Sequence, residues 1–193
     1  KGVKEKFSSL KQYNDCAREL HHKEDWASVD LDDSLRMIAV FFERNKDKYN
    51  DKSLIEQELK IKLGEYKFVG FADRIDFSET GLEIIDYKTG KTVITPRHRN
   101  WQLGLYALSA QKNYGRVKGM TLDMLKQEKP LEFALDEKGN AVSVNSNVSF
   151  NIYEVENELI DTASKIAKAY ETGFKACEPE KNCEFCNEYV YGI

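Results

Sequence analysis

The spacing of hydrophobic residues predicts two helices in the first fifty positions. In residues 7–20 hydrophobic side chains recur every three or four positions, which places them on one helical face with Ser8 or Ser9 as N-cap. Residues 31–49 repeat this spacing, and Asp32–Asp33 suits the positive end of a second helix. The hydrophobic positions are Leu10, Tyr13, Ala17 and Leu20 in the first segment and Leu31, Leu35, Ile38, Phe41 and Phe42 in the second.

The period then changes to two, which is typical of β-strands. In the strand that begins near Glu56, Leu59, Ile61 and Leu63 alternate with Glu58, Lys60 and Lys62. Gly64–Glu65 then predicts a turn into a second strand, Tyr66–Asp76. A further turn at Ser78–Gly81 leads to a third strand at 82–88. These three strands form a predicted antiparallel meander.

The second half of the chain mixes helical and strand periods. Helices are predicted at 97–112, with Trp101, Leu105 and Leu108 on one side, and at 153–172; strands are predicted at 120–124 and 131–135. The last helix should stop at Gly173 and point Val155, Leu159, Ala163, Ile166 and Tyr170 inward. Helices flanking a mixed sheet make this an α/β (α+β) fold, and the length favours a single domain, 1–193.

Composition excludes some classes of protein. With 41% hydrophobic residues the chain can form one sizeable core, and no run of 18 or more apolar residues exists that could span a membrane. No secretory signal opens the sequence, so we expect a cytoplasmic protein without a membrane partner. The net charge of −4 does not by itself indicate a nucleic-acid binder. One local basic run fits either a DNA contact or a solvated loop: Lys88, Lys91, Arg97, His98 and Arg99.

Two carboxylates and a lysine meet at one point of the predicted sheet. Asp73 and Asp86 lie thirteen residues apart on neighbouring strands, so we expect them to face each other across a hairpin. Side chains alternate along a strand, which puts Lys88 on the face of Asp86 and Tyr87 on the opposite face. Such a cluster is typical of a divalent-metal site that activates water. The alternative is two ordinary surface ion pairs, Asp73 with Arg74 and Asp86 with Lys88.

Three motifs in this order resemble a known family. The segments GFADRID (70–76), EIIDYKTGK (83–91) and QLGLYAL (102–108) look like the PD-(D/E)xK nuclease superfamily, in particular its RecB-type branch. That branch includes AddB-type nucleases, CRISPR-associated spacer-acquisition nucleases and nuclease domains joined to superfamily-one helicases. The resemblance implies a restriction-endonuclease-like fold, a central mixed sheet flanked by helices, with its core in residues 54–135.

The resemblance also implies a metal site. Asp73 and Asp86 would bind Mg²⁺ or Mn²⁺, with the backbone carbonyl of Tyr87 as a third oxygen ligand. Lys88 would position or activate the attacking water and offset charge on the phosphate. Asp86 and Lys88 are expected to reach solvent, so replacing either by alanine should stop cleavage and leave the fold nearly intact.

Further residues complete the site that the resemblance implies. Glu56 matches the acidic residue of the family's first core strand, with Glu58 as the nearby competitor for this role. Gln102 and Tyr106, spaced i, i+4, match the helix motif that braces the site and contacts the DNA strand, although an aromatic side chain at this spacing also fits a core position.

The histidines depart from the RecB-type pattern. Members of that branch carry a metal-binding histidine on a helix between the first cysteine and the first core strand. Only His21 and His22 lie in that window, and His98 follows the lysine. Either this member lacks the histidine or part of the natural chain is missing from the sequence, and all three histidines fit solvated or capping positions.

The four cysteines form a second candidate metal site. They are Cys16 in the helix 7–20 and Cys177, Cys183 and Cys186 in the tail 174–193. Such thiol clusters in a reducing compartment bind metal more often than they form disulfides. The arrangement resembles the [4Fe–4S] staple that joins the two ends of AddB-type nucleases. The usual last cysteine falls near Gly192, so three alternatives stay open: Cys177 replaces it, zinc occupies the site, or the site is degenerate.

Two functions remain in competition. The first is a metal-dependent DNA exonuclease that acts on single-stranded ends in repair or recombination, with DNA and a helicase domain or subunit as partners. The second is a nuclease-fold module that has lost catalysis and serves as a DNA-binding or scaffold part of a helicase–nuclease complex. The intact Asp73, Asp86 and Lys88 favour the first, and the absent histidine favours the second.

Overall fold

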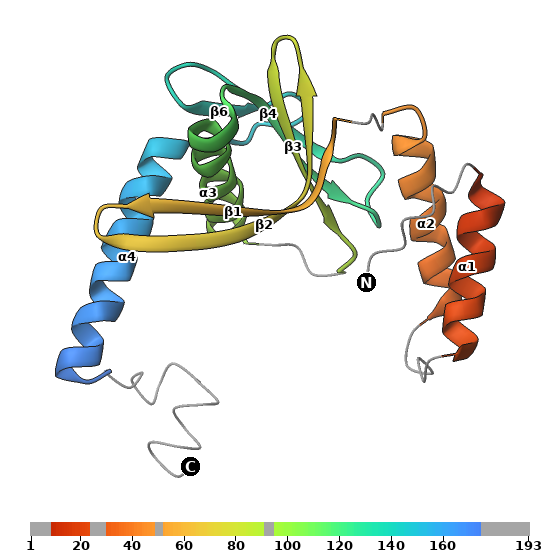
Figure 1. Cartoon of the computed structure of the whole chain (residues 1–193), viewed down its shortest axis with the longest axis horizontal. Helices are drawn as coiled ribbons and strands as arrows, with labels where there is room; N and C mark the ends of the chain where they lie inside the picture. Colours follow the sequence, from red (N-terminus) through yellow and green to blue (C-terminus); the bar gives the residue numbers. More distant parts are fainter. Residues whose placement is uncertain (1–8, 24–29, 49–51, 91–94, 175–193) are drawn as a thin grey trace.

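A seven-stranded mixed sheet organises the protein (Figure 1), whose computed structural model describes residues 9–23, 30–48, 52–90 and 95–174. The spatial order of the strands follows the chain from β1 to β7. Neighbouring strands are antiparallel apart from β3 and β4, which run parallel because α3 connects them as a crossover. The strands are β1 (Leu54–Leu63), β2 (Tyr66–Ser78), β3 (Gly81–Lys88), β4 (Val117–Met124), β5 (Leu131–Leu135), β6 (Asn140–Ser143) and β7 (Ser149–Asn151); the helices are α1 (Leu10–Lys23), α2 (Leu31–Asn45), α3 (Pro96–Tyr114) and α4 (Ile152–Thr172).

Side-chain caps define where the first two helices begin. Ser9 caps α1 through a reciprocal pair, since its Oγ accepts from the Gln12 N–H at 3.4 Å and its own N–H donates to the Gln12 side chain at 3.1 Å. Asp30 caps α2 by accepting from the Asp33 N–H at 3.0 Å. The predicted helices are therefore confirmed with shifted ends, because α1 runs on to Lys23 and α2 stops at Asn45.

The hydrophobic core lies where the sheet packs against α3 and α4. Leu59, Ile61 and Leu63 alternate on the buried face of β1, as their spacing predicts. A Cβ on Gly104 would lie 2.7 Å from Cγ1 of Val155, so the close approach of α3 and α4 requires glycine at this position. Other fully buried apolar residues are Ile75, Ile84, Leu103, Met120, Leu122 and Ile152.

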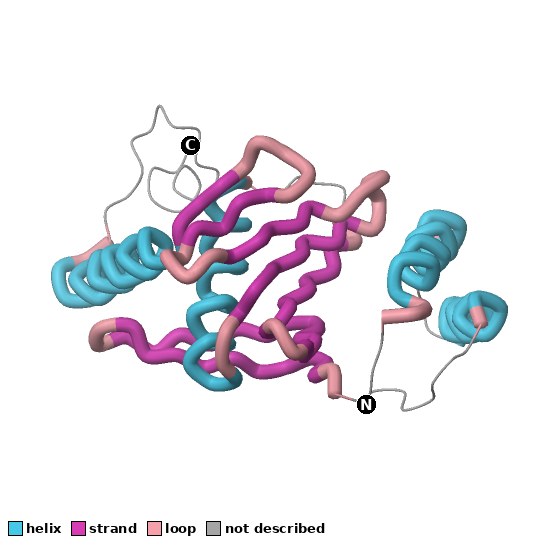
Figure 2. The backbone as a smooth tube through the Cα atoms, turned by 90° about the horizontal axis from the view of Figure 1, so that it is seen from above, coloured by secondary structure: helices cyan, strands magenta, loops and turns pink. Residues whose placement is uncertain are grey.

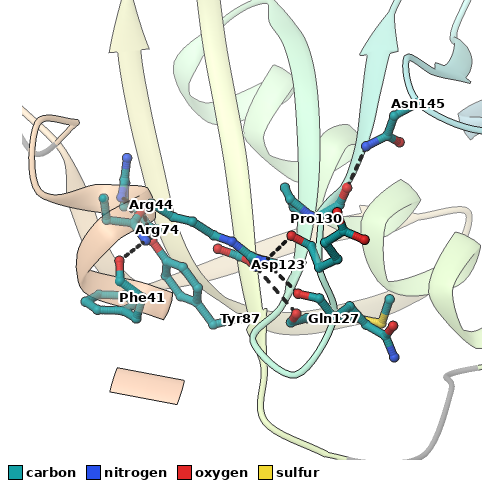
Figure 3. Close-up of polar contacts among 11 residues, drawn as sticks. Phe41, Arg44, Arg74, Tyr87, Asp123, Gln127, Pro130 and Asn145 are labelled. Carbon is teal, nitrogen blue, oxygen red and sulfur yellow. Dashed lines mark hydrogen bonds and ion pairs between the residues drawn. The ribbon is translucent and has the colours of Figure 1, made fainter. Parts of the chain in front are cut away.

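The helices α1 and α2 pack on each other at the end of the molecule opposite α4 (Figure 2). Tyr13 lies edge-on to Phe42, with ring centroids 5.8 Å apart. The pair is fastened to the sheet by Arg44, which forms an ion pair with Asp123 of β4 and donates to the carbonyl of Gln127 at 2.6 Å (Figure 3). The pair thus packs beside the core that lies between the sheet, α3 and α4.

Two features of the second half differ from the sequence-based expectations. The strands β6 and β7 were not predicted, because four and three residues are too few to show an alternating pattern. The inward placement of Ile166 and Tyr170 is wrong: these side chains are 48% and 78% exposed, since the far half of α4 extends beyond the sheet (Figure 1). None of the described helices combines the length and apolar character needed to cross a bilayer.

Candidate active site

Strand pairing brings the two predicted carboxylates together. The antiparallel register pairs Arg74 of β2 with Ile85 of β3, so the preceding residue Asp73 falls opposite Asp86. The Oδ2 atom of Asp73 accepts a hydrogen bond from the backbone N–H of Tyr87 at 2.6 Å. This bond ties one carboxylate to the strand that carries the other.

Asp86 is buried, which corrects the expectation that it reaches solvent. It is 2% exposed, and its Oδ1 accepts a hydrogen bond from Nε2 of Gln102 at 2.9 Å. Its Oδ2 forms an ion pair with the Lys88 ammonium at 2.6 Å. Lys88 keeps about a quarter of its side chain exposed and forms the solvent-facing part of the pair.

Burial sets the electrostatics of this carboxylate. Loss of hydration raises the pKa of Asp86, and the negative charge of Asp73 adds to the rise. Lys88 acts in the opposite direction and lowers the pKa of Asp86, without cancelling the effect of burial. A carboxylate held in this way favours a bound positive charge, because a cation compensates both the lost hydration and the repulsion from Asp73.

Helix α3 places Gln102 and Tyr106 over the carboxylates. Gln102 donates from Nε2 to the Tyr106 hydroxyl at 3.0 Å as well as to Asp86. The ring of Tyr106 is 6% exposed, and burial raises the pKa of its phenol, which stays protonated at neutral pH. A Cβ on Gly70 would lie 2.6 Å from this ring, so glycine in β2 makes room for it.

A backbone irregularity lies beside Asp73. Glu56 has φ of 50° and is the one described non-glycine residue with positive φ. The flanking pairs, Ile55 with Arg74 and Gln57 with Ala72, place it opposite Asp73. Ala72 and Ile75 both belong to the hydrophobic core although they are three residues apart in β2. Regular alternation would place them on opposite faces of the strand, so the alternation shifts between them. The shift puts Asp73 on the same side as Asp86.

Glu56 and Glu58 differ in their surroundings. The exposed Glu56 side chain makes no hydrogen bond or ion pair with the described residues, although it is in register with Asp73. Glu58 points to the outer side of the hairpin, where its Oε2 lies 2.6 Å from the Lys60 ammonium. The register thus favours Glu56 over its competitor for a place at the site.

A buried arginine network supports the site from the opposite face of β3. Arg74 is 1% exposed and forms an ion pair with Asp76. It also donates to the side-chain oxygen of Asn45 at 2.8 Å and to the Tyr87 hydroxyl at 3.0 Å. Figure 3 shows Arg74 and Tyr87 close together near Phe41. The Tyr87 hydroxyl donates to the same Asn45 oxygen at 3.0 Å, and its ring lies edge-on to Phe41 at 5.0 Å. The side chain of Tyr87 therefore points away from the carboxylates, as predicted.

This network was missed by the sequence analysis, which considered Arg74 as a surface partner of Asp73. That interpretation is wrong, because the guanidinium is buried and pairs with Asp76. The available signal was the spacing of Arg74 and Asp76, which are two residues apart and therefore lie on the same face of the strand. Its partner Asn45 lies 29 residues upstream on a helix, where no local pattern indicates the contact.

The donor set fits a divalent cation held mainly by carboxylates. No group of three or more His, Cys, Asp or Glu side chains gathers within the described residues, so two carboxylates with backbone oxygen are what the site offers. A divalent cation held by Asp73 and Asp86 would share the Asp86 carboxylate with Lys88, which is paired with its Oδ2. His21 and His22 lie in the last turns of α1, and His98 lies in the first turn of α3.

The remaining predicted residues fall partly outside the described structure. Cys16 is a half-buried free thiol in α1, and Cys177, Cys183 and Cys186 lie outside the described residues. In the basic run, Lys91 lies outside as well, whereas Arg97 lies in the first turn of α3, with its guanidinium carbon 4.4 Å from the centroid of the Trp101 ring. Of the described members of the run, Lys88 ends β3, and Arg97, His98 and Arg99 lie in α3.

Comparisons with known proteins agree with the motif resemblance. The family model described as "PD-(D/E)XK nuclease superfamily" matches residues 4–188. No curated protein matches the chain. Among solved structures, "Crystal structure of SSO0001" is 13% identical with a TM-score of 0.38, over 98% of this chain and 87% of that chain.

Proposed function

Since this chain belongs to the PD-(D/E)XK nuclease superfamily, we propose that it is a divalent-metal-dependent deoxyribonuclease that acts as an exonuclease on single-stranded ends in DNA repair or recombination. The observation that carries this proposal is the buried carboxylate of Asp86, opposite Asp73 and 2.6 Å from the Lys88 ammonium. The superfamily supports nuclease chemistry, and the opposed carboxylates with an adjacent lysine supply the groups that phosphodiester hydrolysis needs.

The proposed metal ligands are Asp73, Asp86 and the backbone carbonyl of Tyr87. Bound Mg²⁺ or Mn²⁺ would supply Lewis-acid chemistry, polarising the phosphate and lowering the pKa of water. Gln102 fixes the orientation of Asp86 by donating to its Oδ1. The Tyr87 N–H holds Asp73 in the same way, so both carboxylates are oriented before substrate binds.

Lys88 is proposed as the residue that interacts with the reacting phosphate. Its ammonium is partly exposed and next to the carboxylates, where it can donate to a phosphoryl oxygen as negative charge builds in the transition state. Glu56, in register with Asp73, is proposed to hold the attacking water from the exposed side. Tyr106 stays a neutral phenol and positions Gln102 through their shared hydrogen bond.

We further propose that the chain belongs to the RecB-type branch and works with a helicase domain or subunit. The motif order and the four cysteines support this assignment. In this proposal Cys16, Cys177, Cys183 and Cys186 hold a [4Fe–4S] cluster, with zinc as the alternative occupant. Iron and sulfide analysis of anaerobically purified protein, beside Cys183→Ser, tests the cluster. The brown colour of a cluster should disappear in the variant, and colourless, iron-free wild-type protein would refute the assignment.

The test of the nuclease proposal is cleavage of end-labelled single-stranded DNA with Mg²⁺ or Mn²⁺. Wild-type protein should release label in a metal-dependent reaction, and Asp86→Asn, which keeps the shape of the side chain, should not. Circular dichroism of both proteins controls for folding. A folded wild-type protein that binds DNA without cutting it would instead favour the DNA-binding scaffold module.

A further inference from the structure

The two carboxylates lie where the regular pairing of β2 with β3 ends. The last pair of the antiparallel register is Arg74 with Ile85. Asp73 and Asp86 lie one residue further along their strands. On its other edge, β3 stays in register with β4 as far as Lys88. The position of β3 is thus set by β4, whereas the position of Asp73 relative to Asp86 depends on other contacts between β2 and β3.

Tyr87 makes such contacts on both faces of the sheet. Its backbone N–H donates to Oδ2 of Asp73 at 2.6 Å. Its side chain points to the opposite face, where the hydroxyl accepts a hydrogen bond from Nη1 of Arg74 at 3.0 Å. Because Asp73 and Arg74 are consecutive residues of β2, these two hydrogen bonds hold one short piece of β2 against a single residue of β3.

Asn45, the last residue of α2, fixes the direction of these hydrogen bonds. Its side-chain oxygen accepts from the Tyr87 hydroxyl at 3.0 Å and from Nη1 of Arg74 at 2.8 Å. Its amide nitrogen donates to the carbonyl of Phe41 at 2.8 Å, which orients the side chain. The hydroxyl therefore donates to Asn45 and accepts from Arg74. Since Arg74 and Asn45 are buried, another arrangement would leave polar groups without partners.

The charge of Arg74 is balanced on the face opposite the carboxylates. Asp76 forms an ion pair with Arg74, and its Oδ1 accepts from Nε of that residue at 2.8 Å. The Ser53 hydroxyl donates to the same oxygen at 2.7 Å, which holds Asp76 in turn. A guanidinium that is buried and paired in this way suits a positioning role behind the site rather than a contact with substrate.

We propose that Arg74, Asn45 and the Tyr87 hydroxyl, which we call the Tyr87 clamp, are positioning groups that set the affinity of the carboxylate site for its divalent cation. This inference rests on the proposed nuclease function, in which Asp73, Asp86 and the Tyr87 carbonyl bind the cation. The clamp holds β2 and β3 together at the level of these ligands. Replacing groups that orient metal ligands typically weakens metal binding about 10–100-fold.

The first test is isothermal titration of Mn²⁺ into wild-type protein and Tyr87→Phe. The variant removes the hydroxyl and retains both the ring contact with Phe41 and the backbone N–H that donates to Asp73. Its affinity for Mn²⁺ should fall about tenfold. Tyr153→Phe, which removes the hydroxyl of an exposed tyrosine in α4, is the matched control and should bind Mn²⁺ as wild type does.

A second variant separates positioning from stability. Leu159→Ala removes a buried side chain from α4 and leaves the clamp intact. At a temperature where circular dichroism shows every protein to be folded, this variant should bind Mn²⁺ as tightly as wild type although it melts at a lower temperature. Wild-type Mn²⁺ affinity in Tyr87→Phe would overturn the proposal, whatever the melting temperature of that variant.

Asn45→Ala tests whether α2 acts through the same clamp. Alone it should weaken Mn²⁺ binding about as much as Tyr87→Phe does. The double variant should bind hardly more weakly than either single variant, because both substitutions break one hydrogen-bond network. Losses of affinity that simply add would show that the two residues act independently and would overturn the clamp.

The outcomes separate this inference from the proposed function. If wild-type protein binds Mn²⁺ and cuts DNA while the clamp variants bind Mn²⁺ equally tightly, the clamp inference is wrong and the nuclease proposal stands. If the clamp variants bind Mn²⁺ more weakly and recover cleavage at high Mn²⁺ concentration, both are supported. If wild-type protein neither binds Mn²⁺ nor cuts DNA, both fail.

Discussion

Asp86 shows how one residue can be unfavourable for stability and suited to function. A carboxylate that is 2% exposed and close to a second carboxylate is costly in the metal-free protein, because it has lost its hydration. The nearby Lys88 ammonium compensates only in part, since burial still raises the pKa of Asp86. In the proposed function a cation between Asp73 and Asp86 would offset this cost.

The variant Asp86→Asn tests this trade between stability and function. It removes the buried charge and retains the shape of the side chain, so the metal-free protein should melt about 2–4 °C higher, the shift that roughly 1 kcal/mol gives in a domain of this size. The same variant should lose Mn²⁺ binding. Differential scanning calorimetry in EDTA gives the first quantity, and isothermal titration the second. A lower melting temperature in EDTA would contradict the view that the charge destabilises the metal-free state.

The raised pKa of Asp86 also predicts a pH dependence. The folded protein holds a proton on this group at pH values where the unfolded chain has lost it, so metal-free stability should decline as pH rises from the unfolded pKa through the folded one. Protons compete with the metal below the folded pKa, so Mn²⁺ affinity should fall about tenfold per pH unit there. Titrations across mildly acidic pH measure this. Affinity that stays constant down to the ordinary aspartate range would show that Asp86 is not a ligand.

Sequence motifs could predict the residues at the site but not the residues behind it. Asp73, Asp86 and Lys88 lie in two short motifs whose strand pairing follows from a recognisable turn. The contacts of Arg74 with Asn45 depend on how α2 docks, and no local spacing encodes a contact between a strand and a distant helix. The burial of Asp86 was missed for the same reason. The residue that contacts it, Gln102, belongs to α3, and the local sequence of β3 does not indicate that this helix packs on it.

At the scale of elements, β3 is held from both faces. On one face α3 contacts Asp86 through Gln102, and on the other α2 contacts Tyr87 through Asn45 and Phe41. Tyr87, which lies between Asp86 and Lys88, is thus held in place by α2. Docking of α2 should therefore influence the geometry of the carboxylates.

Asn45→Ala tests this support. The substitution removes the buried side-chain oxygen to which both Arg74 and the Tyr87 hydroxyl donate. The free energy of unfolding should therefore fall by about 2 kcal/mol, and the melting temperature by roughly 4–8 °C. Lys46→Ala, one residue further and on an exposed side chain, is the control and should change stability little. Thermal unfolding that is the same in both variants would show that the network does not hold α2 to the sheet.

At the scale of the whole molecule, the sheet ends before α4 does. The hydrophobic spacing of α4 continues over its full length, so periodicity alone predicted a fully covered face. Only the tertiary arrangement shows where the sheet stops: Leu159 is 7% exposed, and Ile166, two turns later, is 48% exposed. The order and type of the main elements were predictable from hydrophobic spacing and motifs. How much of α4 is buried depends on how far the sheet extends beneath it, which the sequence of α4 does not show.

Paired substitutions on α4 locate the end of the core. Leu159→Ala should destabilise the protein by about 2–4 kcal/mol, because it leaves a cavity between α4 and the sheet. Ile166→Ala should cost less than about 1 kcal/mol, since its side chain is already half exposed. Urea denaturation measures both. Equal losses would mean that the far half of α4 is covered as fully as the near half.

The measurement that tests the account most directly is the single-turnover rate of DNA cleavage by Lys88→Ala at saturating enzyme and Mn²⁺. The account predicts a rate at least about 100-fold below wild type, because the ammonium that offsets charge on the phosphate is gone while both carboxylates remain. Lys112→Ala, an exposed lysine in the last turns of α3, should cut at the wild-type rate. Cleavage by Lys88→Ala as fast as by wild type would contradict the assignment of this cluster as the active site.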